Sequence, residues 1–135
     1  MATLKPELQA QLDKLLRLRN GWLDGDGRAP NKQRLKRLFQ VLDTMYLTVP
    51  PLPYVYPTPD GNVQLEWTIG RSEWSMEVDL NTYRGKLYGV WLDSGKEVDG
   101  GEYNLALHFD RERLWSFLVR VNRAAQLSAS MDVIQ

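Results

Sequence analysis

The side chains best suited to acid–base chemistry are carboxylates on two neighbouring segments of alternating sequence. Glu66, Glu73, Glu77 and Asp79 occupy the polar positions of these segments, so a hairpin would place them on one face. Paired carboxylates can act as general acid and general base. The same alternation arises wherever one face of a sheet meets water. We therefore favour a solvated face and keep a small-molecule binder or minor hydrolase as an alternative.

Other chemical motifs are incomplete. His108 is the single histidine, and no G-x-S-x-G sequence presents a serine for it to activate. The Asp-Gly-rich loop at residues 24–27 does not match a calcium loop, because Gln33 stands where the bidentate glutamate belongs, and only a less regular cation site stays open. The segment 94–96 lacks the earlier glycine of a phosphate loop, since Val90 is at that position. We predict no catalytic residue, no metal and no cofactor.

A basic cluster begins the second predicted helix. It comprises Arg28, Lys32, Arg34, Lys36 and Arg37. Such a cluster can contact phosphates, which makes a nucleic-acid-binding regulator an alternative function. The chain as a whole has no net charge, and the loop between the first two helices is too long for a helix-turn-helix. Nucleic acid is therefore the less favoured partner.

Several aromatic residues lie off the clearest apolar stripes. They are Trp22, Tyr54, Tyr56, Tyr83, Tyr88 and Trp115. Exposed aromatic rings beside arginine commonly anchor protein interfaces. The predicted partner-binding set is Trp22, Arg28, Lys32, Arg34, Arg37, Tyr54, Tyr56, Tyr83 and Trp115. An edge strand near the prolines can also accept a partner strand.

Helical periodicity marks both ends of the chain. The first helix begins near Pro6 and is expected to end at Asn20-Gly21. Asn31 is predicted to cap the second helix, and Asp110 the last one. The apolar stripes of these helices are Leu8, Leu12, Leu15 and Leu16; then Leu35, Leu38, Phe39, Leu42, Met45 and Tyr46; and finally Leu114, Phe117, Leu118, Val121 and Ala125.

Between the helices the period changes to two. A Gly70-Arg71 turn of type II′ would pair Trp67 with Trp74, Leu65 with Met76 and Val63 with Val78. Residues 52–58, rich in proline, are predicted as an edge strand. Residues 86–92 are apolar on both parities and predict a central or doubly covered strand. Residues 94–101 are expected to be a polar loop, followed by a strand at 103–107.

This order of elements predicts an α+β fold. Two N-terminal helices precede an antiparallel sheet of four to five strands, and one C-terminal helix packs on the sheet. We expect residues 1–127 to form a single domain and residues 128–135 a flexible C-terminal tail.

Composition restricts the setting. The 135 residues include no cysteine, which excludes disulfides and thiolate chemistry, and no stretch is apolar enough to span a bilayer. We expect a cytoplasmic protein without a membrane partner. Residues 1–47 carry nine Lys/Arg against five Asp/Glu, whereas residues 48–110 carry four against ten. We expect these oppositely charged layers to attract each other.

Two stretches of the sequence form recognisable motifs. Gly21-Trp22, Asp24 to Gly27 and Ala29-Pro30 resemble a W-D-G-x-G-A-x-P loop, here with Leu23 inserted, and residues 57–67 resemble a P-T-x-D-G-x-x-x-L-E-W hairpin. Together they resemble a family of small uncharacterised bacterial proteins, some of them carried on mobile elements. The resemblance implies a shared fold unit and no particular activity.

These observations favour a non-enzymatic protein-binding module. Its small size, charge asymmetry and surplus aromatic residues suit an accessory, inhibitor or antitoxin-like protein, and the resemblance implies bacteria, phages or mobile elements as its setting. The nucleic-acid regulator and the acidic-face binder are the alternatives.

Overall fold

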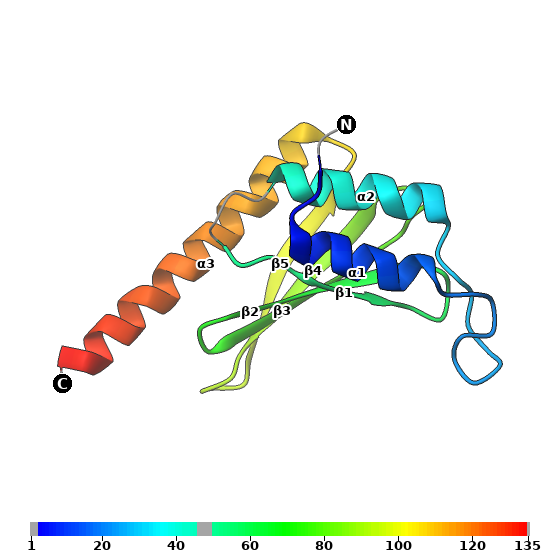
Figure 1. Ribbon diagram of the computed structural model, residues 1–135. Coiled ribbons are helices and arrows are strands. Elements are labelled where there is room, and N and C mark those ends of the chain that lie inside the picture. Colours follow the sequence, from blue (N-terminus) through cyan, green and yellow to red (C-terminus); the bar gives the residue numbers. More distant parts are fainter. Residues whose placement is uncertain (1–2, 46–49, 135) are drawn as a thin grey trace.

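The helices lie on one side of an antiparallel sheet (Figure 1). The computed structural model describes the backbone of residues 3–45 and 50–134, and their side chains up to residue 129. In chain order the elements are α1 (Pro6–Leu16), α2 (Lys32–Met45), β1 (Tyr54–Pro57), β2 (Val63–Ile69), β3 (Ser72–Val78), β4 (Arg84–Trp91), β5 (Lys96–Asn104) and α3 (His108–Ile134). The predicted α+β class is confirmed, with a sheet of five strands in the described residues.

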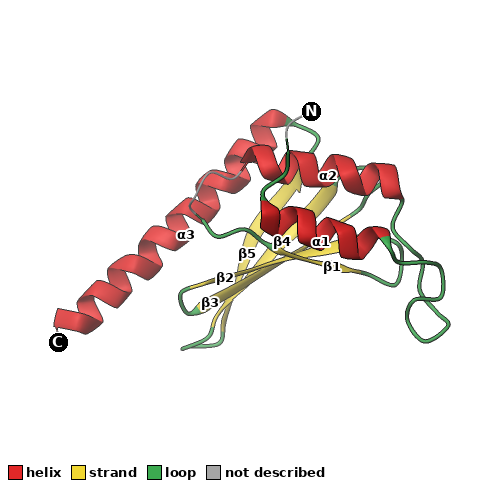
Figure 2. Cartoon of the chain, in the orientation of Figure 1, coloured by secondary structure: helices red, strands yellow, loops and turns green. Residues whose placement is uncertain are grey.

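The strands follow one another in space as they do in sequence, from β1 to β5 (Figure 2). The predicted β2–β3 register is confirmed, with Trp67 opposite Trp74 and Leu65 opposite Met76. Gly70 has a φ of 59° while Arg71 keeps a negative φ, as a type II′ turn requires. Because side chains alternate along each strand, this register sends the apolar residues of both strands toward the helices.

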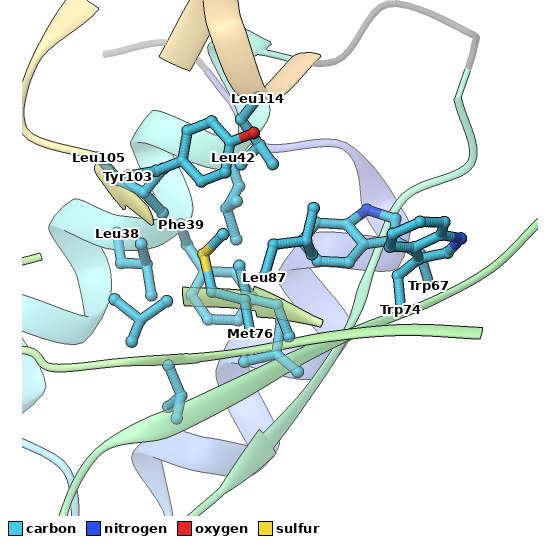
Figure 3. Packing of buried hydrophobic residues seen from close by; sticks show 14 of the residues in the cluster. Leu38, Phe39, Leu42, Trp67, Trp74, Met76, Leu87, Tyr103, Leu105 and Leu114 are labelled. Atoms are coloured by element: carbon cyan, nitrogen blue, oxygen red, sulfur yellow. The ribbon is translucent and has the colours of Figure 1, made fainter. Parts of the chain in front are cut away.

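The core lies between this face of the sheet and the helices (Figure 3). Trp67 and Trp74 are almost fully buried, and the Phe117 ring of α3 meets Trp74 edge-on with 5.2 Å between ring centroids. The Trp74 indole donates to the Ser72 hydroxyl at 2.8 Å, which in turn donates to the Ile69 carbonyl at 2.7 Å. The buried indole N–H is therefore satisfied, and loss of the ring would cost about 3–5 kcal/mol.

The helix starts follow local rules in two cases. Pro6 stands in the first turn of α1, and the Asn31 side chain accepts a hydrogen bond from the backbone N–H of Arg34 at 3.0 Å. Helix α1 ends at Leu16, four residues before the expected Asn20-Gly21 stop, because residues 21–27 bond to one another in a loop of their own. The predicted contribution of Tyr46 to the α2 stripe lies outside the described residues.

The last strand and the last helix differ from the prediction. Residues 96–101 belong to β5 and are not a loop, and residues 105–107 form a turn instead of a strand. The helix begins at His108, so Asp110 is not its cap. Its carboxylate lies in the first turn and accepts from the Asn104 backbone N–H at 2.7 Å. Helix α3 continues to Ile134 and runs beyond the sheet, where a tail was expected (Figure 1).

Strand β4 is central, as predicted, but it is covered on one face only. Leu87 points into the core, whereas Tyr88 is 52% exposed. Gly89 also faces the core, where a Cβ atom would come within 2.2 Å of the Trp74 ring. The apolar residues on the other parity of β4 therefore lie on the uncovered side of the sheet.

The β1 edge of the sheet is closed by a side chain of α1. The Gln11 amide donates to the Pro53 carbonyl at 3.1 Å and accepts from the Val55 N–H at 2.6 Å, as a neighbouring strand would do. Pro57 has no N–H to offer. This arrangement protects the edge from pairing with another chain.

Replacing Gln11 with alanine should therefore weaken the fold. The Gln11→Ala variant leaves a half-buried N–H and C=O without their partners, and we expect the free energy of unfolding to fall by about 1–2 kcal/mol. Urea denaturation measures the change. Gln9→Ala is the matched control, because Gln9 bonds only to Asp13 on the same helix surface. Equal destabilisation by both variants would refute this role.

Candidate functional site

None of the described helices lies over one face of the sheet (Figure 2). We call this surface the open face. From strand alternation and register, it consists of Tyr54, Tyr56, Gln64, Glu66, Thr68, Glu73, Ser75, Glu77, Arg84, Lys86, Tyr88, Val90, Glu97, Asp99, Glu102 and Asn104.

Three cross-strand rows organise these residues. The middle row runs Tyr54, Glu66, Ser75, Tyr88 and Asp99, one residue from each strand. The rows on either side run Thr68, Glu73, Val90 and Glu97, and Tyr56, Gln64, Glu77, Lys86 and Glu102. Directly opposed side chains on one face lie close together, so each row acts as a contiguous strip of surface.

A β-bulge in β5 shapes the edge of the open face that this strand forms. The register shifts between Leu87 and Tyr88, which leaves Gly100 as an extra residue on β5. The shift places Asp99 and Glu102 on the same face although they are three residues apart. Tyr103 then points into the core, where its phenol donates to the Gly100 carbonyl at 2.6 Å. Burial raises the pKa of Tyr103.

Three tyrosine side chains on the open face are exposed to solvent. Tyr54 and Tyr56 are 60% and 43% exposed, and their rings stack at 5.5 Å between centroids. Tyr88 lies in the same row as Tyr54, with Glu66 and Ser75 between them. Exposed tyrosines among polar neighbours supply apolar contact area at a low entropy cost.

The open face is strongly acidic. It carries six carboxylates against two cations, Arg84 and Lys86, and none of these carboxylates is in an ion pair within the described residues. Lys86 lies with its ammonium 5.2 Å from the centroid of the Tyr88 ring. The Tyr88 hydroxyl and the nearby carboxylates of Asp99 and Glu102 raise the pKa of Lys86. The acidic charge is therefore only partly neutralised by the protein itself.

The central part of the open face is hollowed. A depression of about 510 Å³ lies across β2, β3, β4 and the start of β5. Glu66, Glu73 and Glu97 stand around it, with Ser75 and Tyr88 between them. The sheet's twist produces such a concavity when no helix fills it. Its carboxylates, hydroxyl and ring can bind a cation or a basic side chain.

The predicted interface residues fall into separate groups. Tyr54 and Tyr56 lie on the open face. Lys32 and Arg37 are exposed on α2, on the opposite side of the molecule from it. Trp115 lies on α3 beside Met45 and His108, and its indole nitrogen is buried without a hydrogen-bond partner in the described part of the chain. The structure does not bring these groups together.

Other predicted residues have structural contacts. The Trp22 indole donates to the Arg28 carbonyl at 2.9 Å and packs on Gly27, so it holds its own loop together. Arg34 donates to the Asn81 side chain, and the Tyr83 phenol donates to the Arg34 carbonyl at 3.1 Å. These contacts tie α2 to the β3–β4 turn and occupy Arg34 and Tyr83.

The two sequence motifs lie against each other. The Arg28 N–H donates to the Pro59 carbonyl at 2.9 Å, and a Cβ on Gly61 would come within 3.4 Å of the Arg28 side chain. In the same turn, Thr58 is buried and its hydroxyl accepts from the Asn62 N–H at 3.1 Å. These bonds give the motif residues a structural role at one end of the molecule.

The expected attraction between charged layers does not take the form of ion pairs. Within the described residues, Lys5, just before α1, pairs with Asp43 of α2, and Arg71 of the β2–β3 turn pairs with Asp93 of the β4–β5 turn. No ion pair among these residues joins the basic helices to the open face. Asp79, predicted to share that face, instead accepts from the Asn81 N–H at 2.7 Å in the β3–β4 turn. The core separates the two charged surfaces.

Sequence reasoning found Glu66, Glu73 and Glu77 on one face but missed their neighbours on β4 and β5. Glu97, Asp99 and Glu102 lie in a segment whose alternation is broken by Gly100-Gly101. The two glycines, placed between charged and aromatic residues, are the signal of a bulge. With one residue inserted there, the three carboxylates fall on the face already predicted to be acidic.

Within the described residues, no three His, Asp or Glu side chains form a group that could hold a metal ion. His108 instead pairs with Glu112 at 3.0 Å on the exposed start of α3. No described helix combines the length and apolar character needed to cross a bilayer. Comparisons with protein families, with curated proteins and with solved structures gave no match to this chain.

The difference in exposure among the tyrosines can be tested chemically. With a limiting amount of tetranitromethane, Tyr54, Tyr56 and Tyr88 should be nitrated well before Tyr103, which is only 5% exposed. Peptide mass spectrometry measures the order of reaction. Tyr103 is the internal control, because its phenol is buried and hydrogen-bonded. Nitration of Tyr103 at the same rate, with the circular dichroism spectrum unchanged, would contradict the described face.

Proposed function

We propose that this protein is a non-enzymatic protein-binding module and that the open face is its binding surface. The observation that supports this is the exposure of Tyr54, Tyr56 and Tyr88 on a sheet face that none of the described helices covers. Tyrosine is enriched in protein interfaces and in the residues that contribute most to binding. The charged residues around these rings would form the polar rim.

The size of the surface fits such a role. Strands of seven to nine residues border the open face, and adjacent strands lie about 4.8 Å apart. A five-stranded face of this kind offers an area comparable to the ~800 Å² that each partner contributes to a standard interface. The Gln11 closure of the β1 edge favours contact across the face over addition of a strand.

We also propose a biological role and a cellular location for this module. The small size, the uneven charge and the exposed aromatic residues support an accessory, inhibitor or antitoxin-like role, and the resemblance of the two motifs to small bacterial proteins supports the cytoplasm of a bacterium, or a phage or mobile element, as its setting. Binding of nucleic acid is the second candidate. It is supported by Lys32, Lys36 and Arg37, which are exposed on α2 and in no ion pair within the described residues.

The tyrosines of the open face should be required for binding. A tagged protein is purified from the cells that naturally express it, and partners present in stoichiometric amount are identified by mass spectrometry. We expect the triple variant Tyr54→Ser, Tyr56→Ser, Tyr88→Ser to lose such a partner, because truncating central aromatic residues typically costs about 2 kcal/mol or more each.

The matched control removes exposed apolar side chains elsewhere. The triple variant Leu23→Ser, Phe109→Ser, Leu127→Ser changes residues that are 43%, 72% and 67% exposed and lie off the open face. It should retain the partner. If the tyrosine variant retains the protein partner, the proposal is overturned. It is also overturned if only nucleic acid is recovered and this nucleic acid is released by salt and by the double variant Lys32→Glu, Arg37→Glu.

A further inference from the structure

The charge of the open face indicates the chemistry of its partner. We infer, resting on the proposed function, that the open face binds a positively charged polypeptide segment and that an arginine side chain of this segment enters the central hollow. The inferred partner is a protein that presents arginine residues.

The first step is charge complementarity. The six carboxylates of the open face face water without ion-pair partners in the described residues. An acidic partner, or nucleic acid, would meet repulsion there, whereas a basic segment would be attracted and oriented before contact. Much of this attraction acts at the encounter, so it weakens as salt increases.

The second step is the shape and chemistry of the hollow. Glu66, Glu73 and Glu97 reach it from three different strands, and Tyr88 provides an aromatic wall. A guanidinium group is planar, carries five donors and stacks on aromatic rings, so it can contact several carboxylates and the Tyr88 ring together. A lysine ammonium is a compact point charge and uses fewer of these groups.

The third step is the arrangement of rings along the sheet. Tyr54 and Tyr56 stack on β1, and Tyr88 lies on β4 in the same row as Tyr54, with two strands between them. A segment that crosses the strands would contact the stacked pair at one end and the hollow at the other. The tyrosines would provide apolar contact while the carboxylates select positive charge.

Two cations stand within the described residues of this surface, Arg84 and Lys86, and Lys86 is the one that lies over the Tyr88 ring. It therefore repels an incoming arginine and occupies part of the ring that a guanidinium would use. Removing its charge should strengthen binding of a basic segment. A variant that only folds less well would bind the peptide more weakly, so tighter binding by a Lys86 variant must come from the removed charge.

The test uses fluorescent eight-residue peptides in which threonine alternates with arginine, with lysine or with glutamate. Anisotropy titrations at about 50 mM and about 300 mM salt measure their dissociation constants, since screening differs strongly between these conditions. We expect the arginine peptide to bind more tightly than the lysine peptide, the glutamate peptide not to bind, and binding to weaken at the higher salt.

The acidic variant changes the residues around the hollow without changing their size. Glu66→Gln, Glu73→Gln, Glu97→Gln should weaken arginine-peptide binding by about tenfold at low salt, because each exposed ion pair contributes modestly and up to three would be lost. The matched control, Asp13→Asn, Asp24→Asn, Asp26→Asn, changes net charge equally but lies on α1 and its following loop. It should change binding less than twofold, and Lys86→Gln should tighten it. Unchanged melting temperatures confirm that all variants fold.

Several outcomes overturn the inference. Equal weakening by both acidic triples would mean that only net charge matters, and equal binding of arginine and lysine peptides would exclude an arginine-specific hollow. Sedimentation equilibrium of the protein alone identifies another occupant. Self-association lost in the Glu66, Glu73, Glu97 variant would show that a second copy covers the face.

Failure of this inference and failure of the proposed function are distinguishable. If a cellular partner is lost in the tyrosine variant but is not displaced by excess arginine peptide, the binding module stands and the basic chemistry of its partner is wrong. If the partner survives in the tyrosine variant, the proposed function itself is wrong, whatever the peptides do.

Discussion

The covering of only one face of the sheet is the constraint on which the rest of this structure depends. Alternation along β2 and β3 sends Trp67, Trp74 and their apolar neighbours to a single side, where the helices bury them. Everything on the other parity of the same strands must then face water. The core and the open face are two results of one register, so neither can change without the other.

Side-chain bonds to the backbone close the margins of this two-layer arrangement. Gln11 takes the place of a strand beside β1, and Asp110 accepts from the last residue of β5. At one end, Arg28 and Pro59 join the loop after α1 to the β1–β2 turn. These bonds satisfy polar groups that the sheet leaves unpaired. They also confine the surface available for association to the open face and the outer sides of the helices.

Charge follows the same division. The basic residues of α2 and the carboxylates of the open face lie on opposite sides of the core, so their attraction is a long-range field and not a set of contacts. Such a field orients a charged partner on approach. The acidic side also carries the exposed tyrosines, and this combination of rings and charge is the basis of the proposed binding role.

The sequence by itself determined the local features. Period-two alternation with Gly70-Arg71 predicted the β2–β3 pairing, and Asn31 predicted the start of α2, because turn and cap chemistry act over a few residues. The sequence also placed Glu66, Glu73 and Glu77 on one face. Tertiary structure decided what covers each face. The apolar residues on both parities of 86–92 predicted a central or doubly covered strand. The described helices cover only one side of this strand, so Tyr88 is exposed on the other. The contacts of Arg34 with Asn81 and of Tyr83 with Arg34 likewise join residues far apart in the chain, and no local pattern specifies such contacts.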